Sequence, residues 1–220
     1  MRLVLLGPPG VGKGTQGRRL ATENGLALIS TGEILRDAVA RRTALGIEAQ
    51  RRMEAGLLVS DEVMIALVKE RSTRPDAARG FVLDGFPRTV PQAEALDAIL
   101  DGQSLRLDQV VSLNAAEAEL VRRLSARREC PTCKRAYNLL SAPPAAGRHC
   151  DAHAQVELVQ RVDDQEGTIK RRLDVYRLET EPVIGHYRAQ GRLVLVPGTG
   201  TVDQVYRLLK QALGSPEPSR

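Results

Sequence analysis

The segment GPPGVGKGT at residues 7–15 constrains the fold more than any other part of the chain. It follows a short apolar run, Arg2–Leu6, which is typical of a buried strand, and it precedes a helical segment that extends to about Glu23. Glycines in such a segment let the backbone curl, so that several N–H groups converge on phosphate oxygens at the positive end of a helix. The order strand, loop and helix therefore predicts a phosphate-binding loop.

The loop departs from the general pattern at one position. Gly7, Gly12 and Lys13 fit G-x-x-x-x-G-K-[ST], and Lys13 supplies a point charge for β- and γ-phosphates. The residue after the lysine is Gly14, where most such loops carry a hydroxyl that binds Mg²⁺, and Thr15 comes one position later. This departure distinguishes the loop from the common form of the motif.

Short apolar runs alternate with helical patterns along the rest of the chain. Strands are predicted at residues 26–29, 81–83, 109–113 and 193–196. Helices are predicted at residues 33–42, 45–55, 60–74, 91–100, 115–128 and 163–189, with a terminal helix after residue 200 and a frayed Pro/Ser-rich tail at 214–220. This alternation is typical of a parallel sheet covered by helices on both faces.

The positive charge of the chain comes almost wholly from arginine. The formal net charge is +5, and only five of the 32 basic residues are lysines. Arginine presents a rigid fork that matches phosphate oxygens, so polyphosphates and nucleic acid are both candidate ligands. The sequence contains no apolar run of about 18 residues and no signal-peptide cleavage pattern, which argues against a membrane span or export. Three cysteines cannot all pair with one another, so the cytoplasm is the expected location.

Metal-binding side chains occur in two short pairs separated by sixteen residues: Cys130 with Cys133, and Cys150 with His153. Two such pairs predict a four-coordinate zinc site. His149 and Asp151 are alternative fourth ligands, and a metal-free ribbon with reduced thiols is the other alternative. Four protein ligands leave no open position, so the zinc is expected to stabilise a small β-ribbon and to take no part in chemistry.

Four segments together resemble one protein family. They are GPPGVGKGT at 7–15, STGEILR at 30–36, DGFPRT at 84–89 with Gln92, and RVDDQE at 161–166 followed by Arg172. In this form and order they resemble the adenylate kinases and their close relatives, the UMP/CMP kinases. The cysteine segment is similar to the zinc-bearing lid of many bacterial adenylate kinases, whereas UMP/CMP kinases generally lack a long lid. The resemblance extends along nearly the whole chain.

This resemblance implies a fold with three parts. A P-loop NTPase-type α/β core, a parallel sheet flanked by helices, would comprise residues 1–29, 60–126 and 164–220. A helical AMP-binding flap at 30–59 and a small β-ribbon zinc lid at 127–163 would be inserted into this core. Closure of the flap and lid over the substrates would exclude water, the competing acceptor.

The resemblance also implies roles for individual residues. The residues expected to bind AMP are Thr31, Arg36, Leu57, Leu58, Val59, Gly85, Phe86, Pro87, Arg88, Gln92, Arg161 and Arg172. Those expected to bind ATP are Gly10, Val11, Gly12, Lys13, Gly14, Thr15, Arg123, Arg127, Tyr137 and Gly200. The expected catalytic residues are Lys13, Asp84, Arg88, Arg123, Arg161 and Arg172. Asp84 would orient Mg²⁺ through water, and Asp163 and Asp164 could hold charges of the closed lid.

The expected reaction is reversible phosphoryl transfer from MgATP to AMP, which gives two ADP. Its loose transition state requires positioning and positive charge more than proton transfer, so arginines from separate parts of the chain suit it. Mg²⁺, brought with ATP, and a structural Zn²⁺ are the expected metals. ATP, AMP and ADP are the expected ligands of a monomer that binds neither nucleic acid nor membranes.

Two alternatives remain at the level of sequence. The first is a UMP/CMP kinase with the same chemistry and a different acceptor base. The second is a non-enzymatic nucleotide-binding switch whose zinc ribbon grips nucleic acid. That function requires interleaved basic and aromatic residues, of which the ribbon offers Lys134, Arg135, Tyr137 and Arg148.

Overall fold

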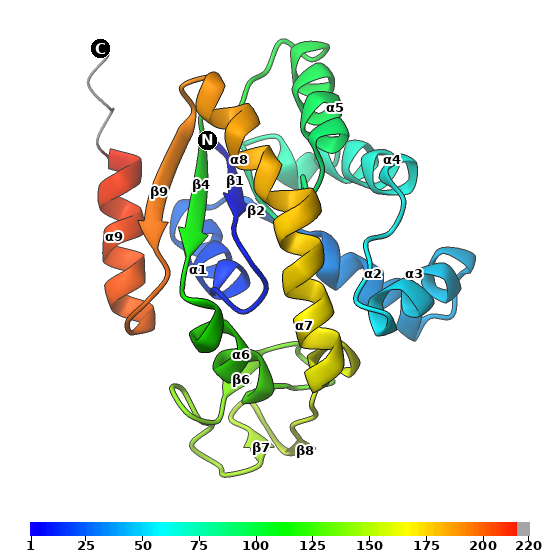
Figure 1. Ribbon diagram of the computed structural model, residues 1–220, viewed down its shortest axis with the longest axis vertical. Coiled ribbons are helices and arrows are strands. Elements are labelled where there is room, and N and C mark those ends of the chain that lie inside the picture. The colour runs from blue at the N-terminus through cyan, green and yellow to red at the C-terminus, as the bar shows by residue number, and fades with distance from the viewer. Residues whose placement is uncertain (215–220) are drawn as a thin grey trace.

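A five-stranded parallel sheet forms the centre of the computed structural model, which describes residues 1–214. Its strands, in spatial order, are β2 (Ala27–Ser30), β3 (Phe81–Asp84), β1 (Arg2–Leu6), β4 (Gln109–Asn114) and β9 (Leu193–Pro197). Every neighbouring pair is parallel, so the carboxyl ends of all five strands meet at one edge (Figure 1). The prediction of a parallel α/β sheet is confirmed. The prediction of a frayed tail concerns residues that lie, except for residue 214, outside the described part.

The strand order decides where a ligand can bind. From β1 the chain passes to β2 and β3 on one side of the sheet, and then to β4 and β9 on the other side. The connection after β1 therefore leaves the carboxyl edge toward one side of the sheet, and the connection after β4 leaves it toward the other side. Such a switch in strand order opens a crevice outside the carboxyl ends of the strands, and the phosphate loop at residues 7–15 lies there.

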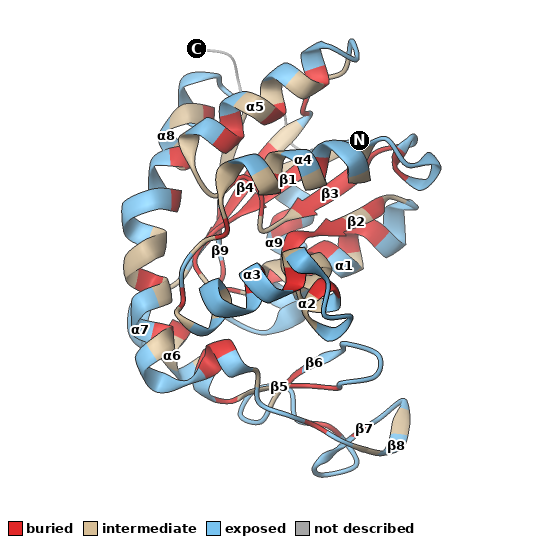
Figure 2. Ribbon diagram, turned by 90° about the vertical axis from the view of Figure 1, so that its right-hand side faces the viewer, coloured by how far each residue is buried: buried red, intermediate tan, exposed pale blue. Residues whose placement is uncertain are grey.

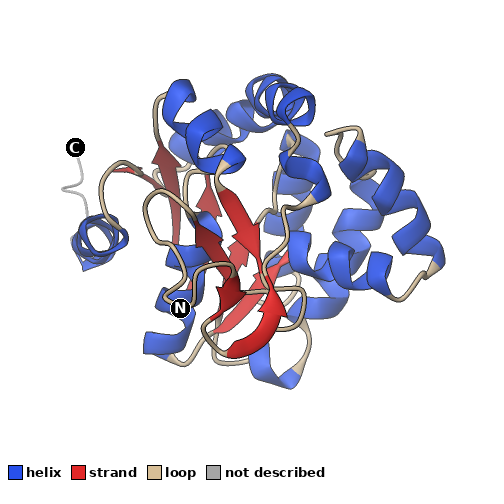
Figure 3. Cartoon of the chain, turned by 90° about the horizontal axis from the view of Figure 1, so that it is seen from below, coloured by secondary structure: helices blue, strands red, loops and turns tan. Residues whose placement is uncertain are grey.

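Helices cover both faces of the sheet because buried side chains alternate along its strands. Leu3 and Leu5 of β1 belong to one apolar cluster, and Val4 and Leu6 belong to a second. The first cluster includes residues of α1 and α9, and the second includes residues of α5 and α8 (Figure 3). These helices are α1 (Lys13–Asn24), α5 (Val90–Asp101), α8 (Glu181–Ala189) and α9 (Val202–Gly214).

Between β2 and β3 the chain forms three helices and a short turn. They are α2 (Thr31–Ala40), α3 (Ala44–Glu54), α4 (Asp61–Ser72) and a 3₁₀ turn at Pro75–Ala77. The side chain of Thr43 caps α3 by accepting a hydrogen bond from the Gly46 N–H at 3.0 Å. The pair α2–α3 stands beside the sheet, on the same side of the molecule as the ribbon of residues 127–163 (Figure 2).

The helix predicted at 115–128 ends earlier than the sequence indicated. Helix α6 covers Glu117–Ser125, and the chain then becomes strand β5 (Arg127–Glu129). β5 pairs with β6 (Ala136–Asn138) in antiparallel register. The prediction of helix for residues 126–128 was therefore wrong, because a partner strand further along the chain competes for their backbone hydrogen bonds.

The long helix predicted at 163–189 is divided into parts. Val162–Asp164 form a 3₁₀ turn, α7 covers Glu166–Val175, and a π-helical turn at Tyr176–Thr180 joins it to α8. Pro182 lies at the start of α8 and has no backbone N–H to continue the regular hydrogen-bond ladder. A local widening of the helix accommodates this loss.

The ribbon has almost no apolar core of its own. Besides β5 and β6 it contains β7 (His149–Cys150) and β8 (His153–Glu157). Its buried cluster consists of Cys130, Tyr137, Cys150 and Leu158. So small a cluster predicts that another interaction stabilises the ribbon. Across the described residues, no helix has the length and apolar character needed to cross a bilayer.

Candidate functional site

The backbone of the phosphate loop lies very close to the neighbouring strand β4. Gly7 has a φ of 136°, and a Cβ atom there would lie 2.3 Å from the Leu113 carbonyl oxygen. Any side chain would therefore displace the loop from the sheet. Helix α1 begins at Lys13, and Gly12, in a left-handed conformation, provides no side-chain cap. The first N–H groups of α1 can therefore bind an anion, as the sequence predicts.

Lys13 folds back over the loop. Its Nζ atom donates hydrogen bonds to the carbonyl oxygens of Gly7 at 2.6 Å and Pro8 at 2.9 Å. Burial lowers the pKa of Lys13 to about 8; Asp84 opposes this shift, and Arg88, Arg172 and Arg127 add to it. An anion close to Lys13 would favour its charged form, so this environment suits a phosphate.

Asp84 explains why the residue after Lys13 is glycine. Asp84 ends β3 and pairs in register with Leu5 of β1, which brings its carboxylate to the loop. A Cβ atom at Gly14 would lie 3.3 Å from Asp84 Oδ2. The hydroxyl of Ser30 lies 3.4 Å from the same oxygen. A carboxylate thus occupies space beside the position where other loops carry a hydroxyl, and Thr15 is exposed one residue further on.

A hydrogen-bonded network holds the segment after β3. Gly85 O accepts hydrogen bonds from Thr31 Oγ1 and from Arg88 Nε, both at 2.8 Å. Gln92 Oε1 accepts from the Arg88 N–H at 2.8 Å, and Gln92 Nε2 donates to Asp61 Oδ1 at 2.7 Å. The network therefore brings together Thr31, Gly85, Arg88 and Gln92, four of the residues predicted to bind AMP.

Several of the other predicted residues have buried side chains, namely Val11, Val59, Phe86, Pro87 and Tyr137. Phe86 is fully buried in the core, so its ring cannot reach a ligand in the crevice. Tyr137 is buried in the ribbon, where its hydroxyl contacts Cys150 Sγ at 3.4 Å and accepts a hydrogen bond from the Asp151 N–H at 3.0 Å. Leu57 is 39% exposed, and it belongs to the segment Leu57–Val59 that joins α3 and α4.

Arginines from several elements converge beyond the loop. We call them the arginine cluster: Arg36, Arg88, Arg127, Arg161 and Arg172. Two acids neutralise part of this charge. Asp164 accepts hydrogen bonds from Arg127 at 2.6 and 2.7 Å and from Arg172 at 2.9 Å. Asp163 lies 3.2 Å from both Arg161 Nε and Arg172 Nη1.

Burial, with like charge as a smaller contribution, shifts the pKa values of the arginine cluster. Burial lowers the pKa of Arg36 to about 10, and Arg161 adds to this shift. Burial likewise lowers the pKa of Arg172 to about 10. Burial alone would raise the pKa of Asp163, but Arg172, Arg161 and Arg127 together hold it well below its usual range. The cluster therefore favours any additional anion.

Two of the residues predicted to bind ATP, Arg123 and Gly200, belong to α6 and to the segment after β9. Arg123 of α6 pairs with Glu119 at 2.7 Å and donates to the Gly198 carbonyl oxygen at 2.8 Å. Gly200 lies in the same connection after β9 and is exposed, so its backbone is available to a ligand. The side chain of Arg123 thus joins α6 to the segment that contains Gly200.

The predicted metal ligands form one compact group. The sulfur atoms of Cys130, Cys133 and Cys150 and a ring nitrogen of His153 all lie within 4.8 Å of one another. Hydrogen bonding from Tyr137 lowers the pKa of Cys150 to about 6, which favours the thiolate that binds metal. Of the alternative ligands, Asp151 accepts a hydrogen bond from the Ala145 N–H at 2.8 Å, and neither it nor His149 belongs to the group.

Sequence reasoning missed two residues of the site. Asp61, at the start of α4, received no binding role from the sequence, but its carboxylate anchors Gln92 and accepts a hydrogen bond from Thr89 Oγ1 at 2.9 Å. Glu129 is buried and lies 3.5 Å from Arg161. An acidic residue in the first turn of a helix is a weak signal for Asp61, because such residues are common at helix starts. No local signal points to Glu129, because its neighbours in sequence suggested a helix and a metal site.

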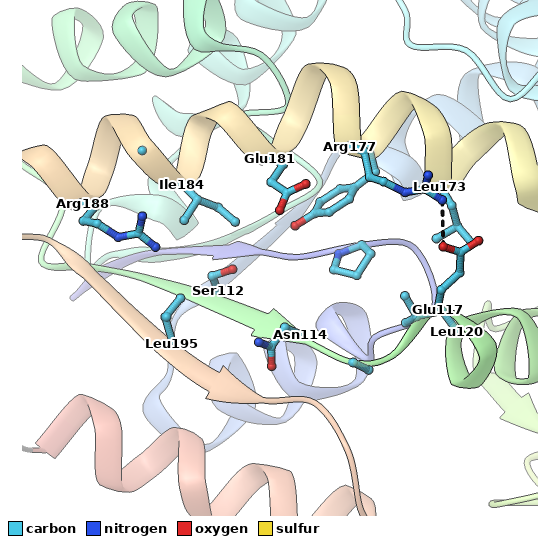
Figure 4. Close-up of a pocket in the computed structure, with 14 residues that line it drawn as sticks. Ser112, Asn114, Glu117, Leu120, Leu173, Arg177, Glu181, Ile184, Arg188 and Leu195 are labelled. Carbon is cyan, nitrogen blue, oxygen red and sulfur yellow. Dashed lines mark hydrogen bonds and ion pairs between the residues drawn. The ribbon is translucent and has the colours of Figure 1, made fainter.

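A separate pocket of about 450 Å³ lies between the strands β4 and β9 and the helices α7 and α8 (Figure 4). Ser112, Asn114 and Leu195 line it from the strands, and the ion pair of Glu117 with Arg177 lies at one end. It includes Pro8 of the phosphate loop but none of the residues predicted to bind nucleotide. The predicted site is therefore distinct from this pocket.

A phosphate loop at the switch point of a parallel sheet, facing a cluster of arginines, defines a phosphoryl-transfer protein of the P-loop class. The sequence model of the adenylate kinase family matches residues 5–192. The chain is 47% identical to an adenylate kinase of Methanocella arvoryzae, over 97% of this chain and 98% of that protein. It is 50% identical to one of Citrifermentans bemidjiense, over 93% and 95% of the two chains. It is 48% identical to one of Gloeobacter violaceus, over 97% and 98%. The chain belongs to the adenylate kinase family.

Proposed function

We propose that the protein is an ATP:AMP phosphotransferase. An oxygen of the AMP phosphate attacks the γ-phosphorus of ATP, the bond from that phosphorus to the β,γ-bridging oxygen breaks, and two ADP result. The observation that carries this proposal is the convergence of five arginines on one side of the phosphate loop. Positive charge placed around the transferring group is the main catalytic requirement of this reaction.

ATP would bind at the phosphate loop. The N–H groups of residues 10–15 and the Lys13 ammonium would hold its β- and γ-phosphates, and Arg123, Arg127 and Gly200 would contact its remaining parts. The carboxylate of Asp84 and the hydroxyl of Thr15 are oxygen groups of the kind that Mg²⁺ prefers. The Mg²⁺ of ATP would neutralise charge on the phosphates, and Asp84 would orient it through water.

AMP would bind between α2–α3 and the segment after β3. Thr31, Gly85, Arg88 and Gln92 already form one hydrogen-bonded unit there. Arg36 and Arg88 would hold the phosphate, and the backbone of Leu57–Val59 would line the base. Arg161 and Arg172 would bridge the two nucleotides. Asp163 and Asp164 would orient these arginines, whose remaining N–H groups would bind the incoming phosphates.

The boundaries expected from sequence for a flap at 30–59 and a lid at 127–163 are part of the proposal. Contacts between α3 and the 3₁₀ turn at Val162–Asp164 support closure of these two parts toward one another. Thr168 Oγ1 also lies 3.4 Å from the Glu54 carbonyl oxygen. Closure would exclude water and would bring the arginines together around the phosphates.

We also propose that the ribbon holds one structural zinc ion. Cys130, Cys133, Cys150 and His153 supply three sulfur ligands and one nitrogen ligand, which is a set that zinc prefers. The apolar cluster of the ribbon is too small to stabilise it without a further interaction. With four protein ligands the ion would have no position for water or substrate.

The two alternative functions have less support. The relatives described above are adenylate kinases, and the long ribbon distinguishes the chain from the UMP/CMP kinases. On the ribbon, Arg135 lies over the Tyr137 ring at 5.3 Å and Lys134 donates to the Pro131 carbonyl oxygen, so both side chains have local partners. We propose that the protein acts as a monomer, does not bind nucleic acid, and works in the cytoplasm, where its three cysteines would stay reduced and able to bind the metal.

A coupled assay with MgATP and each nucleoside monophosphate tests the function. AMP should be phosphorylated at least about ten times faster than UMP or CMP. A pocket that forms hydrogen bonds with adenine would leave its own polar groups unpaired when a pyrimidine binds. Comparable rates with UMP would refute the assignment to AMP and leave the wider class of nucleoside monophosphate kinases.

A further inference from the structure

One acidic side chain joins two parts of the molecule that the proposed function expects to move separately. Glu129 of β5 is 7% exposed, and its Oε2 atom lies 3.5 Å from Arg161 Nη1. Its Oε1 atom lies 4.0 Å from Arg36 Nε. Arg161 belongs to the ribbon segment, whereas Arg36 belongs to α2. The carboxylate therefore bridges the ribbon and the helical pair α2–α3.

The backbone holds Glu129 firmly to the ribbon. Its N–H donates to the Val159 carbonyl oxygen at 2.8 Å, and its own carbonyl oxygen accepts from the Val159 N–H at 3.0 Å. It also pairs with Ala136 across β5 and β6, and the next residue is Cys130 of the metal-binding group. Because both sides of its backbone are paired, the carboxylate moves with the ribbon as one unit.

The Glu129 carboxylate is the ion-pair partner of the Nε edge of the Arg36 guanidinium. Its Nε atom is buried and has no hydrogen-bond partner among the described residues. The Nη1 atom lies close to Gly32, 3.1 Å from where a Cβ atom would be. A buried guanidinium edge without a hydrogen bond is costly, so the nearby anion determines the direction in which Arg36 is held. The Nη atoms of Arg36 then remain available to a phosphate.

We propose that Glu129 is a positioning residue that couples the two nucleotide sites. Closure of the ribbon over ATP brings the carboxylate to Arg36 and holds its guanidinium in the orientation that binds the AMP phosphate. The inference rests on the proposed function, because it takes Arg36 as an AMP ligand. Coupling of this kind is reciprocal, so ATP increases the affinity for AMP by the same factor by which AMP increases the affinity for ATP.

Calorimetric titration measures this coupling directly. The dissociation constant of AMP is determined alone and with a saturating non-hydrolysable ATP analogue and Mg²⁺, and the ratio of the two values is the coupling factor. We expect a factor of at least about five in the unmodified protein, the lower end of typical allosteric couplings. Glu129→Gln keeps the shape of the side chain and removes its charge, and it should bring the factor close to one.

Two further variants make the test specific. Glu157→Gln removes the same charge from an exposed position on β8 of the same ribbon and should leave the coupling factor unchanged. Glu129→Asp keeps the charge with a shorter reach and should retain part of the coupling. In steady-state assays Glu129→Gln should raise the KM for AMP and change kcat little, a division that general destabilisation would not produce.

The outcomes separate the inference from the proposed function. An unchanged or larger coupling factor in the Glu129→Gln protein overturns the inference, and a larger one means that the carboxylate competes with phosphate. An unmodified protein that binds both nucleotides without coupling also overturns it. An unmodified protein that does not bind AMP refutes the proposed function instead. If Glu129→Gln does not fold, full wild-type coupling in a folded Glu129→Ala variant overturns the inference, and loss of coupling there supports it.

Discussion

Loss of the metal site should unfold the ribbon and leave the α/β core intact. The buried cluster of the ribbon contains two large side chains, Tyr137 and Leu158, and burial of each contributes about 1.5–3 kcal/mol. Ordering a single residue costs about 1–2 kcal/mol, so this cluster offsets the ordering of only a few residues. Structural zinc contributes about 10–16 kcal/mol in small domains. The His153→Ala substitution, or chelation, should therefore destabilise the ribbon first.

Limited proteolysis detects this local unfolding. Lys134 and Arg135 are exposed trypsin sites in the turn between β5 and β6. In the His153→Ala variant, cleavage there should be at least about tenfold faster, which corresponds to about 1.4 kcal/mol of local opening. His149→Ala is the matched control, because His149 precedes a metal-binding cysteine but lies outside the group. Metal analysis of the unmodified protein should find about one zinc ion per chain.

Turnover at low temperature should fall only modestly, because all five residues of the arginine cluster lie outside residues 130–153. A fully metal-free protein with unchanged cleavage and melting temperature would refute the metal site. Loss of all activity in a stripped enzyme whose ribbon is still folded would show that the metal does more than stabilise the ribbon.

Three further predictions concern the phosphate site. Replacing Lys13 or Arg88 by Met should lower kcat by about a hundredfold or more, the scale for loss of one preorganised donor, and a folded variant that kept over a tenth of wild-type turnover would contradict this. The folded-state pKa of Lys13, about 8, lies below its ordinary value of 10.5, so the unfolded chain binds more protons between these values. The Lys13 contribution to stability should therefore rise from about pH 8 to pH 10.5 and be absent in Lys13→Met. The kcat/KM for ATP should fall above about pH 8, because the free enzyme loses this cation.

Local signals made most of the fold predictable from sequence. The apolar run Arg2–Leu6 and the glycines of residues 7–15 determine a strand and a loop through their own backbone preferences. The spacing of the cysteines and His153 predicted a metal site but left His149 and Asp151 as alternative ligands, and only the fold showed that His153 lies with the three cysteines. The segment DGFPRT at 84–89 indicated the family, although the roles of its residues in binding remain predictions.

Tertiary structure decided what depends on partners distant in sequence. Residues 126–128 have a helical pattern, but Arg127 and Arg128 pair with β6, and the helix ends at Ser125. Asp61 anchors Gln92 across 31 positions of the chain. Glu129 lies beside the predicted metal ligand Cys130 in sequence, yet the fold places its carboxylate between Arg36 and Arg161. The sequence gives the charge and size of each side chain. The contacts that determine its role form only when separate segments of the chain fold against one another.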